Sequence, residues 1–397
     1  MAETHSIRGH NSDSPGLPRF LHQIKRTAFS AHTGVARRDI RSCLAYATWP
    51  TLPLLERHAL TATILTYAKM TRLRCLAKTA QLAAFVALSV FSTLAGAADK
   101  VTFVTDYGLY GRHAYYFVAM EKGYYARENL DIEIVRSQGS ANTIKQVANG
   151  TAQVGFADAF AVVLGRANDD IPVKLVAMIY PKPPHAVYVL KESGIARPKD
   201  FEGKTLADTA FSSVPKLFAT YAKAAGIDAG KVKWIAVNSD ALPGMLTTRR
   251  VDGIGQFTVG EPLLATAAAP KQVLGFLYSD AGLDYYSNGI IASDIMIETN
   301  PGLVRRFVAA TLEGLKSAMA DPKEAGEIMH KYHREIDVDI AIGETRKVME
   351  LATQPNAALG ALDPGRIQKT IDTVAETFAL KRRVSPTDVY APGFLPN

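Results

Sequence analysis

The sequence has little cysteine: only Cys43 and Cys75 in 397 residues, and both lie within the first 97. The remainder therefore offers no disulfide, no thiol nucleophile and no cysteine-ligated metal. It also lacks the G-x-S-x-G, P-loop, G-x-G-x-x-G and H-E-x-x-H signatures. His330 and His333 are spaced for one helix face, where we expect solvent rather than a metal. We therefore expect no catalytic residues, no metal site and no cofactor.

A surplus of positive charge is also missing from most of the chain. Residues 1–97 contain 12 of the 45 Lys and Arg and 4 of the 38 Asp and Glu, which leaves 33 against 34 for residues 98–397. Nucleic-acid binding requires clustered positive charge on the folded part, so we expect no nucleic-acid partner. The 48% apolar content, with 29 Gly and 20 Pro, is typical of a globular chain with room for two domains.

The pattern of a signal peptide begins at Met70. A basic stretch at Arg72–Lys78 precedes the apolar run Ala80–Leu94, and the small residues Ala95–Ala97 follow. This three-part pattern predicts a secretory signal peptide over 70–97, and therefore export to the periplasm. The apolar run is short for a permanent membrane helix, although a retained anchor is the alternative.

Residues 1–69 precede this signal and show no sustained periodicity. Because a signal peptide acts at an N-terminus, we favour translation from Met70 and leave 1–69 unassigned; a true presequence is the alternative. No cysteine follows the small residues near position 97, so a lipid anchor is not indicated.

Short apolar runs alternate with amphipathic stretches after residue 98, which predicts an α/β fold with parallel sheet. Pro181–Pro184 interrupts this alternation, after which it resumes. The segment 147–155 is similar in kind to 246–254, which indicates either two related halves or two ordinary helix–turn–strand junctions. The C-terminal third is mostly helical, with an irregular tail from Ser385. The expected strands are 101–106, 130–134, 153–157, 173–180, 186–190, 204–207, 233–237, 252–257 and 289–293.

Aromatic and polar side chains gather where these expected strands end. In open α/β sheets, ligands bind in the crevice beyond the carboxyl ends of the strands. Several of these residues also have an ordinary structural explanation, for example helix capping by Asp158 or Ser212. The candidate ligand-binding residues are Asp106, Tyr107, Tyr110, His113, Asp158, Tyr180, His185, Ser212, Ser213, Gln256, Glu261 and Tyr285.

Two motifs resemble the periplasmic substrate-binding proteins of ABC transporters. Phe117–Tyr125 is similar to their A-x-E-K-G-[FY]-[FY] helix, and Pro198–Thr205 is similar to their P-x-D-L-x-G-K-T entry to the second lobe. The resemblance covers roughly residues 100–320. It is strongest to the pyrimidine-precursor (thiamine-biosynthesis-like) binding proteins, with alkanesulfonate, taurine and nitrate binders as relatives.

The resemblance implies a type 2 periplasmic binding protein fold with two lobes, each a mostly parallel sheet flanked by helices. Lobe 1 would cover 98–190 and lobe 2 would cover 191–286, while 287–397 would return to lobe 1 and add the C-terminal helices. Hinge closure of the lobes would hold a small-molecule solute. The protein would be a monomer that delivers this solute to an ABC permease and its ATPase.

The resemblance also implies roles for individual residues. Pyrimidine-precursor binders have a histidine in the first-strand loop and an acid in the second lobe, which His113 and Glu261 match. Tyr107 and Tyr110 would stack on the ring, although the family pattern has Asp-Trp where this chain has Asp106-Tyr107. An alkanesulfonate, taurine or nitrate binder that uses Ser212 and Ser213 is one alternative.

A second alternative is a pyrimidine-precursor synthase on the same fold. The related fungal synthases use a cysteine-rich motif that this sequence lacks, so we expect a binding protein and no enzyme. A sensory or structural module is a third alternative.

Overall fold

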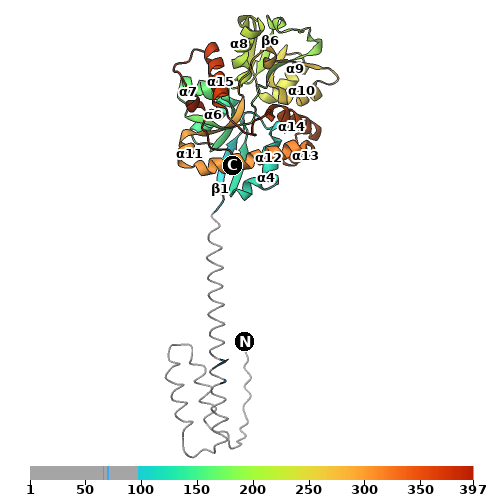
Figure 1. Ribbon diagram of the computed structural model, residues 1–397. Helices are drawn as coiled ribbons and strands as arrows, with labels where there is room; N and C mark the ends of the chain where they lie inside the picture. Colours follow the sequence, from blue (N-terminus) through green and yellow to red (C-terminus); the bar gives the residue numbers. More distant parts are fainter. Residues whose placement is uncertain (1–65, 67–68, 71–96, 397) are drawn as a thin grey trace, which may run out of the picture. The chain divides into compact units, whose positions relative to one another are not determined.

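The computed structural model describes residues 66, 69–70 and 97–396 (Figure 1). Residues 1–69 and the predicted signal peptide fall almost wholly outside the described residues, so both stay predictions. In the part of the chain that is described, no helix combines the length and apolar character needed to cross a membrane. Residues Ala97–Asn397 form a compact unit of their own.

The first sheet has the strand order β2-β1-β3-β10-β4. β1 pairs in parallel with β2 and β3, whereas β10 is antiparallel to both β3 and β4. Four strands therefore run one way and β10 runs the other. The strands are β1 (Asp99–Val104), β2 (Leu130–Val135), β3 (Val154–Asp158), β4 (Val173–Met178) and β10 (Asn288–Ser293).

The second sheet has the order β7-β6-β8-β5-β9, which repeats the layout of the first. β6 pairs in parallel with β7 and β8, and β5 is the reversed strand between β8 and β9. Its strands are β5 (His185–Leu190), β6 (Thr205–Asp208), β7 (Lys233–Ala236), β8 (Gly253–Phe257) and β9 (Val273–Leu277). The similar segments 147–155 and 246–254 lead into β3 and β8, which occupy equivalent places in the two sheets.

The chain passes between the sheets twice, and each passage supplies the reversed strand of the sheet it enters. The first passage lies between β4 and β5 and contains Pro181–Pro184; the second joins β9 to β10. β5 pairs only with β8 and β9, so the predicted lobe boundary after Leu190 does not follow the sheets: the second sheet already begins at His185. Residue 286, where the sequence predicts the return to lobe 1, lies within the second passage, between Leu277 and Asn288. Below, lobe 1 and lobe 2 denote the two sheets with their helices.

Helices cover both faces of the two sheets, which completes the two-lobe fold that the sequence predicted (Figure 1). In lobe 1, Phe103 of β1 packs against Phe307 of α12, with ring centroids 5.2 Å apart. Burying such a ring contributes about 1.5–3 kcal/mol. The helices of lobe 1 are α4 (Ala114–Glu121), α5 (Tyr124–Arg127), α6 (Ser140–Ala148), α7 (Ala159–Asp169), α11 (Asp294–Thr299), α12 (Pro301–Ala320), α13 (Pro322–Tyr332), α14 (Val338–Ala352), α15 (Pro364–Thr377) and α16 (Pro386–Val389). Those of lobe 2 are α8 (Ser213–Ala225), α9 (Leu242–Thr247) and α10 (Glu261–Ala268).

Two C-terminal helices of lobe 1 also contact lobe 2. α14 packs against α10, and α15 packs against α8, where the hydroxyls of Thr220 and Thr377 lie 2.8 Å apart. The tail after Ser385 is irregular as predicted apart from α16, and Tyr390 forms a bridge to Leu175 beside the edge strand β4. The lobes are therefore joined by two chain passages and by helix contacts on two flanks.

Candidate functional site

A pocket lies where the carboxyl ends of the two sheets face each other. Lobe 1 contributes the loop after β1 and the start of α6, while lobe 2 contributes the loop after β6, the start of α8 and the end of β8. The cavity measures about 20 Å³, which is room for roughly one water molecule. Its lining residues are Asp106, Tyr107, Arg112, Gly139, Ser140, Asp208, Ser212, Ser213, Val214, Gly255, Gln256 and Phe257.

The pocket is small because the two lobes touch across it. The Tyr107 hydroxyl donates to Asp208 Oδ1 over 3.1 Å, and the Thr209 hydroxyl donates to the carbonyl of Gln138 over 2.9 Å. Gly139 lies so close to Phe211 that a Cβ on the glycine would come within 2.3 Å of the Phe211 carbonyl oxygen. This is a closed arrangement, so an aromatic solute can enter only if the lobes separate.

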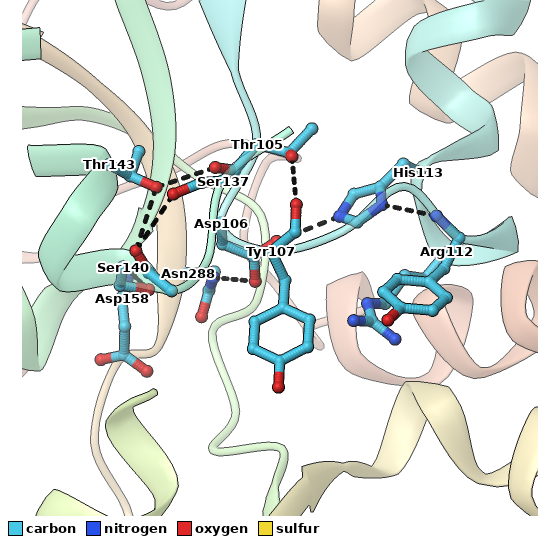
Figure 2. Close-up of polar contacts among 12 residues, drawn as sticks. Thr105, Asp106, Tyr107, Arg112, His113, Ser137, Ser140, Thr143, Asp158 and Asn288 are labelled. Atoms are coloured by element: carbon cyan, nitrogen blue, oxygen red, sulfur yellow. Dashed lines mark hydrogen bonds and ion pairs between the residues drawn. The ribbon is translucent and has the colours of Figure 1, made fainter. Parts of the chain in front are cut away.

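Asp106 is fixed by two neutral donors at the floor of the pocket (Figure 2). His113 Nε2 lies 3.0 Å from its Oδ1, and the Asn288 side-chain amide donates to its Oδ2 over 2.8 Å. Burial lowers the pKa of His113, so its imidazole is neutral at pH 7. The Tyr110 N–H donates to Nδ1, which leaves Nε2 to donate to Asp106. His113 therefore orients Asp106 from beneath the pocket and does not line it.

A second buried network surrounds Asp158 at the end of β3. Its Oδ1 accepts from the Phe160 N–H and caps α7, while its Oδ2 lies 2.8 Å from His185 Nε2 and 2.9 Å from the Ser287 hydroxyl. The Ser213 hydroxyl also meets His185 at Nε2, 2.9 Å away, and the Tyr285 hydroxyl occupies Nδ1.

This second network contains a serine, a histidine and an aspartate, yet it differs from a catalytic triad. In a triad the carboxylate and the serine occupy opposite nitrogens of the imidazole, so that the ring can take the serine proton. Here Ser213 and Asp158 share Nε2. The arrangement suits a buried joint between the lobes rather than an activated nucleophile.

Arg112 is a buried cation that borders the pocket. Its residue is 2% exposed, and its Nε and Nη1 atoms have no hydrogen-bond partner among the described residues. The guanidinium lies over the ring of Tyr110, 4.3 Å from the centroid, which is within the range of a cation–π contact. Its backbone N–H donates to Glu344 Oε2 on α14 over 2.9 Å. Two of the three guanidinium nitrogens, Nε and Nη1, are therefore buried with unused donors.

Asp208 borders the pocket from lobe 2. Its Oδ1 accepts from Tyr107 and from the Thr209 N–H, while its Oδ2 is buried and lacks a partner in the described structure. Burial raises the pKa of this carboxyl to about 7. Burial also raises the pKa of the Tyr107 phenol, and Asp208 raises it further, so the phenol stays protonated and donates.

The structure brings five of the predicted residues together at the pocket: Asp106, Tyr107, Ser212, Ser213 and Gln256. It places the others elsewhere. Tyr110 supports Arg112, and the remaining set is buried behind the pocket: His113, Asp158, Tyr180, His185 and Tyr285.

Glu261 lies outside the pocket, which differs from the role that the family resemblance implied. Its carboxylate is 3.3 Å from Lys347 Nζ on α14, and its side chain is 42% exposed. It lines a separate pocket beside the passages between the lobes, together with Lys182 and Asp284. As the first residue of α10, its direction depends on how α10 packs against α14, which no local pattern reveals.

Sequence analysis missed several lining residues, of which Arg112 and Asp208 bear most on the chemistry. The sequence does carry a signal for Asp208, because it is an acid at the end of β6 as Asp158 is at the end of β3, but the expected strand 204–207 stops one residue before it. Metal ligands are a separate matter: within the described ranges, no cluster of three or more His, Cys, Asp or Glu is placed to hold a metal ion.

Comparison with known proteins adds a family and named relatives. A family model described as "NMT1/THI5 like" matches residues 111–325, more than half of the chain. The riboflavin-binding protein RibY of Chloroflexus aurantiacus is 30% identical over 243 residues, 58% of this chain and 65% of that protein. The chain therefore matches just under two thirds of that relative's length. The formylaminopyrimidine-binding protein of Halalkalibacterium halodurans is 23% identical over 74% of this chain and 90% of its own.

Relatives with an enzyme name also occur. A 4-amino-5-hydroxymethyl-2-methylpyrimidine phosphate synthase of Legionella pneumophila is 25% identical over 58% of this chain and 73% of its own length. Among solved structures, the alkanesulfonate-binding protein SsuA of Xanthomonas axonopodis pv. citri superposes with a TM-score of 0.61 at 13% identity, covering 75% of this chain and all of that one. At that identity the superposition supports the fold alone: two lobes of the periplasmic binding protein type.

Proposed function

Since this chain belongs to the NMT1/THI5-like family, we propose that it is the solute-binding component of an ABC importer. It captures a small, nitrogen-containing aromatic solute between its lobes and delivers it to a permease that an ATPase drives. It works in the periplasm as a monomer after export by the signal peptide at 70–97. Relatives named as riboflavin-binding and formylaminopyrimidine-binding proteins support this class of solute.

One observation carries the proposal: the pocket is built from both lobes at the carboxyl ends of both sheets. A solute held there contacts Tyr107 and Arg112 of lobe 1 and Asp208 of lobe 2 at once. Its binding therefore favours the closed arrangement over the open one, which is what a permease must recognise to distinguish loaded protein from empty.

The charges at the pocket favour a neutral heterocycle over a sulfonate. Asp106 and Asp208 line the cavity with one guanidinium, Arg112. Glu344 lies behind it, and burial raises the pKa of Asp208 and of Glu344 to about 7, so these two carboxyl groups are partly ionised at neutral pH. A sulfonate would add a further negative charge to this set, at a cost in a poorly hydrated pocket. The hydroxyl oxygen of Ser212 caps α8 by accepting from the Val214 N–H, which leaves a single O–H for an anion.

The same site gives no support to synthase activity. Ser213 is not activated by His185, because Asp158 shares the nitrogen that a general base would need. We therefore propose that the solute leaves the protein chemically unchanged, in contrast to the relatives named as synthases.

The test is binding followed by recovery of the ligand. Isothermal titration of the chain with riboflavin and 4-amino-5-hydroxymethyl-2-methylpyrimidine should show binding of at least one, whereas taurine, an alkanesulfonate and nitrate should not bind. Mass spectrometry should recover the bound compound unaltered after hours of incubation. Preferential sulfonate binding, or conversion of the compound, would refute the proposal.

A further inference from the structure

The pocket holds two buried polar groups of opposite hydrogen-bonding character, one on each lobe, and both have unused capacity. Arg112 offers only donors, at Nε and Nη1, and Asp208 in its ionised form offers an acceptor at Oδ2. Each residue is 2% exposed. A buried polar atom without a partner costs free energy, about 1–3 kcal/mol and more when it is charged. Three such atoms, on two residues that border one pocket, indicate that the ligand supplies their partners.

Each of the two groups is held in place by its neighbours, which limits the ligand groups that can hydrogen-bond to it. The Arg112 guanidinium lies over the Tyr110 ring, 4.3 Å from its centroid, and the Arg112 backbone N–H donates to Glu344 Oε2. Asp208 is held at Oδ1 by Tyr107 and Thr209. Its Oδ2 rests against Gly255, where an added Cβ would come within 2.2 Å of it. Both groups are therefore held in position before a ligand arrives.

Hydrogen-bonding geometry then selects a class of ring. A guanidinium pairs best with an edge of two acceptors, such as a carbonyl oxygen beside a ring nitrogen or a second oxygen, whereas a carboxylate accepts from an amino or ring N–H group. An aromatic ring with only an amino group beside ring nitrogens serves Asp208 well and Arg112 poorly. An alkanesulfonate offers acceptors but no N–H for Asp208.

We propose that the ligand is an oxo-substituted nitrogen heterocycle whose carbonyl edge accepts from Arg112 in lobe 1 and whose N–H or amino group donates to Asp208 in lobe 2. This assignment rests on the proposed function and sharpens it. The pyrimidinedione ring of a flavin meets the requirement, with two carbonyl groups flanking an N–H. A ligand that bonds to Arg112 and Asp208 at the same time requires closed lobes, since neither lobe alone supplies both the donor and the acceptor.

The experiment combines protein variants with a change in the ligand. Riboflavin and its N3-methyl derivative, which lacks the ring N–H, are titrated into the full chain and into Arg112→Gln and Asp208→Asn. Arg127→Gln and Asp228→Asn, at exposed residues of lobe 1 and lobe 2, are the matched controls. Far-UV circular dichroism and thermal unfolding establish that each variant folds.

For the unaltered chain we expect N3-methylation of riboflavin to lower its binding affinity at least tenfold. Arg112→Gln should lower the affinity for riboflavin at least tenfold. Asp208→Asn should bind riboflavin and its N3-methyl derivative with affinities within threefold of each other. The control variants should have the affinities of the unaltered chain. If riboflavin binds but N3-methylation and both pocket variants change nothing, or if 4-aminopyrimidine binds more tightly than riboflavin, this assignment is overturned and the proposed function survives. A chain that binds no heterocycle overturns both. If Arg112→Gln does not fold, the affinities of the unaltered chain and of Asp208→Asn for riboflavin and its N3-methyl derivative still test the proposal.

Discussion

The phenol of Tyr107 reaches across the pocket and donates to the carboxyl of Asp208, 3.1 Å away. These residues are 101 positions apart and lie in different lobes, so this bond exists only while the lobes are together. Tyr107 also borders the cavity, where an aromatic solute would meet its ring. One side chain thus contributes both to closure and to the surface on which a ligand would stack.

Replacing Tyr107 separates these two contributions. Tyr107→Phe removes the bond between the lobes but keeps the ring, so we expect a more open ligand-free chain, seen as a larger radius of gyration in X-ray scattering. Tyr107→Ala removes the ring as well and should weaken an aromatic ligand by about 1–3 kcal/mol, as for base–aromatic stacking. If the alanine variant and the unaltered chain bind the ligand with equal affinity, the aromatic ring of the ligand does not stack on Tyr107.

The Asp208 carboxyl should make stability depend on pH in a defined direction. Its pKa rises from an ordinary 3.8 to about 7 on burial, so between pH 4 and 7 the folded chain keeps a proton that the unfolded chain has lost. The free energy of unfolding that this group contributes is therefore complete below about pH 4 and is lost as pH rises through about 7. Tyr107 and Tyr278 are the titratable groups around it, and both remain protonated across this range because burial raises their pKa.

Asp208→Asn keeps the shape of the side chain and removes the titration. We expect the variant to gain stability relative to the unaltered chain as pH rises from 4 to 7, by up to about 4 kcal/mol, and to keep that gain at pH 8. Urea unfolding at several pH values measures the difference, and the raised pKa of Glu344 cancels because both chains contain it. Asp228→Asn, at an exposed position, should give a flat difference; a flat difference for Asp208→Asn as well would show that the carboxyl is not held protonated.

His113 should prove to be a positioning residue. Its imidazole is fully buried and joins Asp106 to the Tyr110 backbone. His113→Ala leaves a cavity and an unpaired carboxylate oxygen, so we expect a loss of roughly 2–4 kcal/mol in the free energy of unfolding. His113→Gln, which can still donate to Asp106, should recover part of both stability and affinity. A direct ligand contact would instead give a loss of affinity with little loss of stability.

The family resemblance and the structure predict different roles for Glu261. The resemblance makes it the acid that holds the ligand, so Glu261→Ala would abolish binding. The structure pairs it with Lys347 outside the pocket, in a half-exposed ion pair of the kind worth about 0–1 kcal/mol. From this geometry we expect ligand affinity to stay within about twofold in calorimetric titration. A complete loss of binding would show that Glu261 contacts the ligand, as the family resemblance implies.

The sequence revealed the strands well because burial imposes local patterns. β2 alternates buried Leu130 and Ile132 with exposed Asp131, and the residues at strand ends could be located before their neighbours were known. β9 was missed because it is an edge strand of half-buried residues whose Gly275 makes room for the Tyr188 ring of β5, a contact between segments 87 residues apart.

The site was less accessible to prediction because its chemistry depends on distant partners. Arg112 lies in the short 3-10 helix Gly111–His113, and no local sequence pattern distinguishes it. Its burial and direction come from Tyr110 and from Glu344, which lies 232 residues further along the chain. The place of Glu261 outside this pocket has the same kind of cause, since α10 packs on α14 and Glu261 pairs with Lys347 of α14.

Gly139 offers a direct test of closure. It precedes α6 with φ of 141°, and an added Cβ would lie 2.3 Å from the carbonyl oxygen of Phe211 in lobe 2. Gly139→Ala therefore meets two penalties, backbone strain within lobe 1 and a collision with lobe 2. Gly150, just beyond the end of α6, has φ of 79° and no atom within 4 Å of an added Cβ, so Gly150→Ala carries strain alone.

The difference between the two glycine variants isolates the collision. Each should lose about 1–3 kcal/mol of stability from the strained backbone. Only Gly139→Ala should also hold the lobes apart, which we expect to lower affinity for the bound heterocycle at least tenfold and to increase the radius of gyration in its presence. Gly150→Ala should bind as the unaltered chain does. If Gly139→Ala binds normally, the ligand is held without the contact between Gly139 and Phe211, and the closed arrangement is not the one that carries the solute.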